Sequence, residues 1–202
     1  MFRTTRIHLA LSLLIIVAAL AAAGSASAGE ARDQRQGFFM GLDLGIGSSH
    51  LEWEKDGQQY ESGDHDGGAV GIRLGYAFNP YFSLSLDARG YGHEGDEQYA
   101  IGTTTLSATV YPMGGGFFIR LSGGQACLET EVEGDDIDPL FAEFKEHGGT
   151  LGLGLGYDWM VSDHVALGLS LESRGVVVED FDDYYEVTAG ESTIGANMTY
   201  YF

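Results

Sequence analysis

Eight charged residues stand within segments that are otherwise apolar or small, and ion pairing between them is the first chemistry that the sequence suggests. Four are carboxylates and four are arginines: Asp43, Arg73, Asp87, Arg89, Arg120, Asp158, Glu172 and Arg174. Charges away from water are tolerated only when they are paired and hydrogen-bonded. The balance predicts a neutralised network on one face of a sheet. A row of charges wetted by a narrow water channel is the alternative.

A second group of acids gathers in the segments 52–68, 93–102, 129–149 and 179–191. Carboxylate oxygens can bind divalent cations, and a formal net charge of −20 can attract a basic ligand or partner. Because the spacing is not that of an EF-hand, a solvated, repulsive surface is the alternative, and we predict no metal centre and no cofactor. The same charge repels phosphates, which excludes nucleic acid as a partner. The candidate cation-binding residues are Asp64, Asp66, Asp135, Asp136, Asp138, Asp182 and Asp183.

Nucleophilic catalysis has little support in the sequence. Ser162, Asp163 and His164 are consecutive, but neighbours in a turn do not form a catalytic triad by adjacency. Cys127 is the only cysteine and cannot form a disulfide within the chain, so we expect it to be a small hydrophobic residue. We therefore predict no catalytic residues and no enzyme.

These residues must be positioned by strands, because apolar side chains recur at every second position in eight segments. Most segments are close to the ~9–11 residues of a tilted membrane strand. The opposite face is rich in Gly, Ser and Thr and carries the eight charges. The apolar faces run over 38–46, 70–78, 82–88, 106–110, 117–121, 151–159, 165–171 and 194–202.

Short turns at 79–81, 112–116 and 161–164 alternate with the four long acidic segments. Short turns at one rim and long loops at the other are typical of an up-and-down transmembrane barrel. A soluble barrel with an apolar interior is the alternative, but it would place many glycines on its solvent face. An arginine facing lipid costs ~2–4 kcal/mol near the midplane, so we expect the arginines to point inward. Aromatic residues expected at the turn rim are Phe78, Tyr81, Phe82, Tyr111, Phe117, Phe118, Tyr157, Trp159, Tyr200 and Phe202.

Three segments are expected along the chain. Residues 1–28 read as a cleaved signal peptide, with Arg3 and Arg6 before an apolar run and Ala26-Ser27-Ala28 at its end. Residues 29–36 would form a short periplasmic segment, and residues 37–202 the barrel. Within the acidic segment 129–149, residues 138–145 read as a short helix with Asp138 as its N-cap.

The chain resembles the small outer-membrane β-barrel family, the OmpA-type barrels and opacity-type surface proteins. The resemblance rests on Phe38 to Gly47, Gly71 to Tyr81, Leu151 to Trp159 and the final Thr-Tyr-Tyr-Phe. It implies an all-β, eight-stranded antiparallel barrel in the outer membrane of a Gram-negative bacterium, in contact with membrane lipid and lipopolysaccharide. It also implies that the barrel assembly machinery reads Met198, Tyr200 and Phe202. Nothing follows Phe202, so we expect no peptidoglycan-binding domain, and we expect a monomer.

Two functional classes remain open at this point. The first is a structural or surface-interaction barrel with a charge-plugged lumen, whose acidic loops contact divalent cations or an extracellular ligand. The second is a pore for small solutes or cations. A lipid-modifying enzyme, as found among some barrels of this size, is a weaker third interpretation because the sequence lacks a suitable serine near His147.

Overall fold

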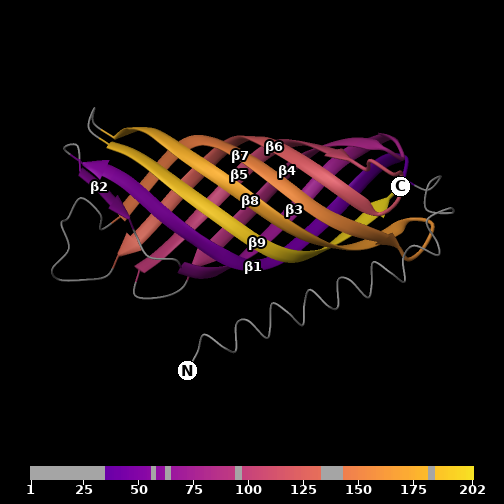
Figure 1. Ribbon diagram of the computed structural model, residues 1–202, viewed down its shortest axis with the longest axis horizontal. Helices are drawn as coiled ribbons and strands as arrows, with labels where there is room; N and C mark the ends of the chain where they lie inside the picture. The colour runs from indigo at the N-terminus through magenta and orange to yellow at the C-terminus, as the bar shows by residue number, and fades with distance from the viewer. Residues whose placement is uncertain (1–34, 56–57, 62–64, 94–96, 133–142, 182–184) are drawn as a thin grey trace, which may run out of the picture.

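The computed structural model describes residues 35–55, 58–61, 65–93, 97–132, 143–181 and 185–202. All regular elements in these ranges are antiparallel strands, which wind into a single barrel (Figure 1). No helix in the described residues is long and apolar enough to cross a membrane. The strands are β1 (Gly37–Lys55), β2 (Gln58–Glu61), β3 (His65–Asn79), β4 (Phe82–His93), β5 (Glu97–Val110), β6 (Phe117–Val132), β7 (Glu143–Met160), β8 (Val165–Phe181) and β9 (Tyr185–Tyr201).

Eight strands close the barrel, and β2 only extends the far end of β1. Each strand from β3 onward pairs with the next, and β9 pairs back with β1. The pairing followed once around from Gly41 arrives at Leu51, ten residues further along β1. Ten residues of ~3.3 Å against eight strand spacings of ~4.8 Å give a strand tilt of about 40°. The predicted eight-stranded antiparallel barrel is therefore confirmed.

The outward-facing side chains form an apolar band next to the turn end of the barrel. On β1 this band runs from Phe38 to Ile46, and both side chains are about two-thirds exposed. Nine residues rising ~3.3 Å each at ~40° tilt cover roughly 23 Å, close to the ~25 Å band of outer-membrane barrels. The apolar face is thus turned to lipid, and the soluble-barrel alternative is wrong for this part of the molecule.

The short turns, the start of β1 and the end of β9 lie together at one rim. The Phe202 N–H donates to the carbonyl of Phe38 at 2.9 Å, so the described start and the end of the chain meet there (Figure 1). Two of the aromatic residues expected in the girdle at this rim, Tyr111 and Phe118, do not face lipid. Both point into the barrel and are almost fully buried, whereas Phe78, Tyr81, Tyr200 and Phe202 are exposed as predicted.

The strands run much further than the alternating apolar segments indicated. β1 continues to Lys55, β6 to Val132 and β8 to Phe181, so much of the four expected loops is paired strand. The helix expected over 138–145 is wrong at its end, because Glu143 to Lys145 belong to β7. Its first residues, 138–142, lie outside the described part, as do residues 1–34, on which the signal peptide and most of the periplasmic segment fall.

Candidate functional site in the barrel lumen

The eight charged residues singled out from the sequence all point into the lumen. Seven of them expose less than a tenth of their surface, and the Arg89 side chain is 8% exposed. They come from six of the eight barrel strands, so the inward parity of the polar face brings them to one interior. Ion pairs join six of the eight, in two separate groups.

The larger group centres on Glu172 of β8. Its two carboxylate oxygens accept hydrogen bonds from Arg120 at 2.5 Å, Arg89 at 2.9 Å and Arg174 at 3.1 Å. Arg89 reaches across the lumen from β4, which is not a neighbour of β8 in the sheet. One buried carboxylate therefore ties three arginines from different walls.

Hydroxyl groups extend this larger group. Arg89 also donates to Thr193 at 2.5 Å, Arg120 to Thr109 at 3.3 Å and Arg174 to Thr103 at 3.2 Å. Each guanidinium carries five donors in a fixed fork, so a carboxylate alone cannot satisfy it. The small polar residues of the inward face supply the additional acceptors.

The smaller group lies nearer the turn end. Arg73 donates to Asp43 at 2.8 Å and to Thr199 at 3.4 Å. Asp87 accepts from Ser107 at 2.5 Å, and Asp158 accepts from the hydroxyl of Tyr111 at 2.8 Å. The predicted pairing of acids with arginines therefore holds for Asp43, whereas the described partners of Asp87 and Asp158 carboxylates are hydroxyls.

Inward-facing glycines leave the room that the arginines occupy. A Cβ atom on Gly41 would lie 3.1 Å from the Arg73 guanidinium, and one on Gly154 would lie 3.2 Å from Glu172 and 3.4 Å from Arg120. An eight-stranded interior is just wide enough for side chains to fill it. The glycines on this face thus determine where the long side chains fit.

Two lumen charges were missed by the sequence reasoning, namely Glu191 and Arg35. Glu191 was assigned to the fourth acidic loop, but it lies on β9 with its side chain 3% exposed and accepts from Arg89 at 2.9 Å. Its parity, shared with Thr193 and Asn197, was the signal that could have found it. The lumen of the described part thus holds five arginines and five acids.

Arg35 precedes β1 and enters the barrel from the turn end. Its guanidinium stacks over the ring of Tyr111 at 4.4 Å and donates to the carbonyl of Asp158 at 3.0 Å and to the carbonyl of Gly115. It is 1% exposed. No alternation marks this residue, since it lies before the first strand.

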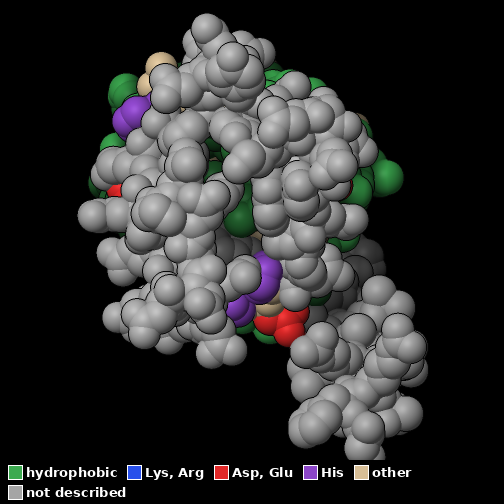
Figure 2. Space-filling model, turned by 90° about the vertical axis from the view of Figure 1, so that its left-hand side faces the viewer, with side chains coloured by type: hydrophobic (Ala, Val, Ile, Leu, Met, Phe, Trp, Pro, Cys, Tyr) green, Lys and Arg blue, Asp and Glu red, His purple; other side chains and the backbone are tan. Residues whose placement is uncertain are grey.

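Apolar layers cover the charged groups at both ends. At the turn end, Phe39, Ala77, Ala166 and Tyr201 form one buried cluster, with Met160 against it. Toward the loop end a larger cluster fills the barrel interior between the extended parts of the strands. Figure 2 looks onto this end and shows hydrophobic side chains deep in the middle. This cluster consists of Ala69, Tyr91, Ile101, Ala126, Leu128, Val176, Val178 and Ala189.

The candidate cation-binding acids lie mostly outside the described residues. Of the seven, only Asp66 is described, and its carbonyl contacts the ring of His93 at 2.6 Å. Within the described ranges, no three potential metal ligands gather. Asp64, Asp135, Asp136, Asp138, Asp182 and Asp183 fall in the ranges that are not described.

The residues considered for nucleophilic chemistry are placed as follows. The Ser162 hydroxyl accepts from the backbone N–H of His164 and Val165, at 3.4 and 3.1 Å, and so stabilises a turn. Cys127 is half-buried on the outer wall of β6 and is a free thiol. The expected assembly residues Met198, Tyr200 and Phe202 lie on the outward face of the last strand and its end.

Comparison with known proteins agrees with this architecture. A family model described as the outer membrane protein β-barrel domain matches residues 16–202. Among curated protein sequences, none matches the chain.

Two solved structures share the fold. Neisserial surface protein A is 16% identical with a TM-score of 0.51, and the match covers 82% of this chain and 97% of that one. Ail, the attachment invasion locus protein of Yersinia pestis, is 15% identical with a TM-score of 0.50, over 82% of this chain and 99% of that one. The chain belongs to the outer membrane protein β-barrel domain family, and it is a protein of the Gram-negative cell outer membrane.

Proposed function

We propose that this protein is a closed outer-membrane barrel with a structural and surface-interaction role, rather than a pore or an enzyme. The layered lumen is the observation that carries the proposal. Ions crossing the barrel would have to pass two apolar layers and separate the ion pairs of Glu172 between them. Removing one partner from a buried ion pair costs ~3–5 kcal/mol, so such openings would be rare.

Single-channel recording of the purified protein in planar bilayers tests the closed lumen. We expect no stable conductance from the unmodified protein. The double variant Leu128→Ser/Val176→Ser is the positive control for conductance, because it introduces polar groups into the loop-end apolar layer. A stable, large conductance of the unmodified protein would favour the small-solute or cation pore and contradict the proposal.

The surface-interaction role is supported by the concentration of acids in the chain segments beyond the apolar band. Negative potential at one end of a barrel would favour encounter with basic surfaces, and salt would weaken that attraction. We expect vesicles carrying the protein to bind a polylysine surface at low salt. Replacing the acids within 129–149 by their amides should reduce this binding without loss of barrel assembly, and unchanged binding would refute the role of this segment.

A further inference from the structure

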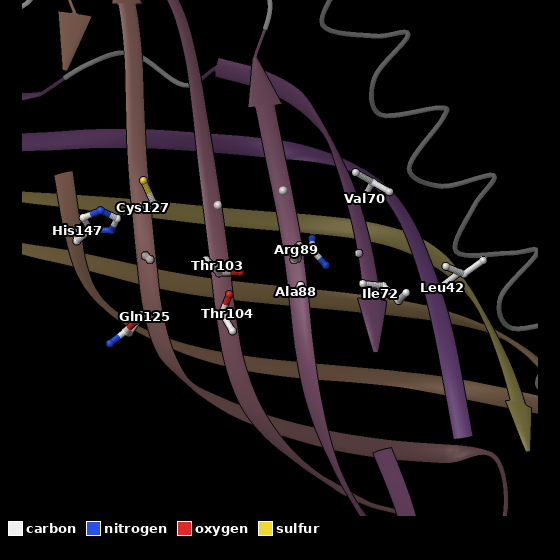
Figure 3. Close-up of a pocket in the computed structure, with 14 residues that line it drawn as sticks. Leu42, Val70, Ile72, Ala88, Arg89, Thr103, Thr104, Gln125, Cys127 and His147 are labelled. Carbon is white, nitrogen blue, oxygen red and sulfur yellow. The ribbon is translucent and has the colours of Figure 1, made fainter. Parts of the chain in front are cut away.

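The outer wall of the barrel carries an oblique groove of about 600 Å³ that no role described above uses. It lies between two rows of outward-facing residues on β1 and β3–β7, among them Leu42, Ile72 and His147, which Figure 3 labels. Its floor is the backbone of the residues between the two rows, which have the inward parity of their strands: Gly71, Arg89, Thr103 and Ala126. The row nearer the turn end is Leu42, Ile72, Ala88, Thr104 and Gln125. The row nearer the loop end is Val70, Gly90, Gly102, Cys127 and His147.

Small residues at the centre of these rows create the groove. A Cβ atom on Gly90 would meet nothing within 4 Å, and one on Gly102 would meet only the carbonyl of Cys127, at 3.9 Å. Ala88 adds a single methyl beside them. These glycines are not required by close packing, so the space above them is open on the outside of the barrel.

The groove changes from apolar to polar along its length. At one end, Leu42, Val70 and Ile72 are 44, 59 and 41% exposed and belong to the lipid-facing band. At the other end, Gln125 and His147 are exposed and polar. The strand tilt carries this polar end away from the turn rim, toward the outer leaflet.

The only guanidinium that lines the groove in the described part does not face it. Arg89 contributes backbone to the floor while its side chain turns inward to Glu172 and Glu191. The polar end therefore offers an amide, a hydroxyl, an imidazole and a thiol, from Gln125, Thr104, His147 and Cys127. These groups suit sugar hydroxyls and amides better than a phosphate, which favours arginine or lysine.

We propose that this groove binds one outer-leaflet glycolipid, with an acyl chain over Gly90 and Gly102 and a sugar headgroup at Gln125 and His147. The wall faces the bilayer, so acyl chains are the available occupant of its apolar part. From Leu42 to His147 the groove crosses five strand spacings, roughly 24 Å at ~4.8 Å each. That length exceeds the ~15 Å depth of one leaflet of a ~30 Å hydrocarbon core, so a whole chain and the start of a headgroup fit.

The test fills the groove without disturbing the lumen. Gly90→Leu places a side chain in the open space, and Gly102→Leu is a second variant at an independent position. Gly175→Leu on β8 is the matched control, because a Cβ there also meets nothing within 4 Å and the residue lies outside the groove. Each variant is used only if it migrates as a heat-modifiable barrel.

The proteins are reconstituted into phosphatidylcholine vesicles containing either lipid A or phosphatidylethanolamine, and lipid retained after extraction is counted by native mass spectrometry. We expect Gly90→Leu and Gly102→Leu to reduce retained lipid A about tenfold, which corresponds to ~1.4 kcal/mol, with Gly175→Leu unchanged. Equal retention of lipid A by all variants would overturn the proposal. Equal retention of phosphatidylethanolamine and lipid A by the unmodified protein would overturn the glycolipid assignment.

The native Cys127 thiol provides a second readout in the same vesicles. Lipid A in the groove should slow its reaction with a maleimide in the unmodified protein and in Gly175→Leu. The slowing should be absent in Gly90→Leu. A maleimide rate that does not depend on lipid A in any of these proteins would count against occupation of the groove.

Discussion

Neutralising Glu172 is the most direct test of the closed lumen. Glu172→Gln keeps the size of the side chain and removes its charge. Its carboxylate accepts from three guanidiniums at 2.5 to 3.1 Å, and its side chain is 5% exposed. After the change, Arg89 keeps Glu191, whereas Arg120 and Arg174 keep no carboxylate among their described partners and donate to the hydroxyls of Thr109 and Thr103.

The cost follows from leaving buried charges without a counter-ion. Removing one partner of a buried ion pair costs ~3–5 kcal/mol, and here two arginines lose their carboxylate together. We therefore expect a loss near the upper end of that range, about 5 kcal/mol. This is a large part of the ~5–15 kcal/mol by which a folded domain is stable.

Equilibrium urea unfolding in lipid vesicles, followed by tryptophan fluorescence and heat-modifiable gel migration, measures the change. Glu129→Gln, at an exposed position of β6, is the control and should change stability by less than ~0.5 kcal/mol. In the double variant Glu172→Gln/Arg174→Gln, part of the loss should be recovered, because one stranded charge is removed as well. A loss below ~1 kcal/mol for Glu172→Gln would mean that water screens these charges, and would refute the closed lumen.

Three further predictions follow from the fold. Deleting Phe202, whose side chain is 72% exposed and whose N–H bonds Phe38, should reduce the heat-modifiable fraction in outer membranes, and equal insertion would contradict its role in assembly. Gly156→Ala should cost ~1–3 kcal/mol in urea unfolding, because its Cβ would clash with the Phe118 ring and the Leu169 carbonyl, whereas Gly175→Ala should be neutral. Arg35→Ala should cost ~1.5–3 kcal/mol through its lost hydrogen bonds and raise brief conductance events in bilayers, and an unchanged stability would show that Arg35 does not close the turn end.

The membrane part of the barrel could be predicted because one solvent imposes one rule on it. Lipid outside and a narrow interior force apolar and polar side chains onto opposite parities, so Leu42 and Asp43 identify both faces of β1. The same rule placed all eight lumen charges. It could not say which charges meet, because the shift of ten residues around the barrel decides that Arg89 faces Glu172 from a distant strand.

The extent of the strands was predicted wrongly for a physical reason. Beyond the apolar band the polarity of the faces is exchanged, with Ile101, Leu128 and Val176 pointing inward and nearly fully buried. A search for outward apolar residues stops where this exchange begins, and it reads the continuing strand as loop. Arg35 was not predicted as a lumen charge for a different reason, because only the closed barrel shows that the segment before β1 enters the lumen.

The exchange of polarity along each strand has a consequence for how deep the barrel sits in the bilayer. Sinking it by two residues, about 5 Å, would draw outward groups such as Gln125 and Ser192 toward hydrocarbon and push Phe38 and Phe202 out of the lipid at the turn rim. Raising it would draw polar groups of the turn rim, such as Ser162 and Asp163, toward hydrocarbon. Both movements meet a hydrophobic mismatch, which costs fractions of a kcal/mol per Å. The barrel is thus anchored at one height, and a thicker bilayer would have to thin around it rather than draw more of the protein inside.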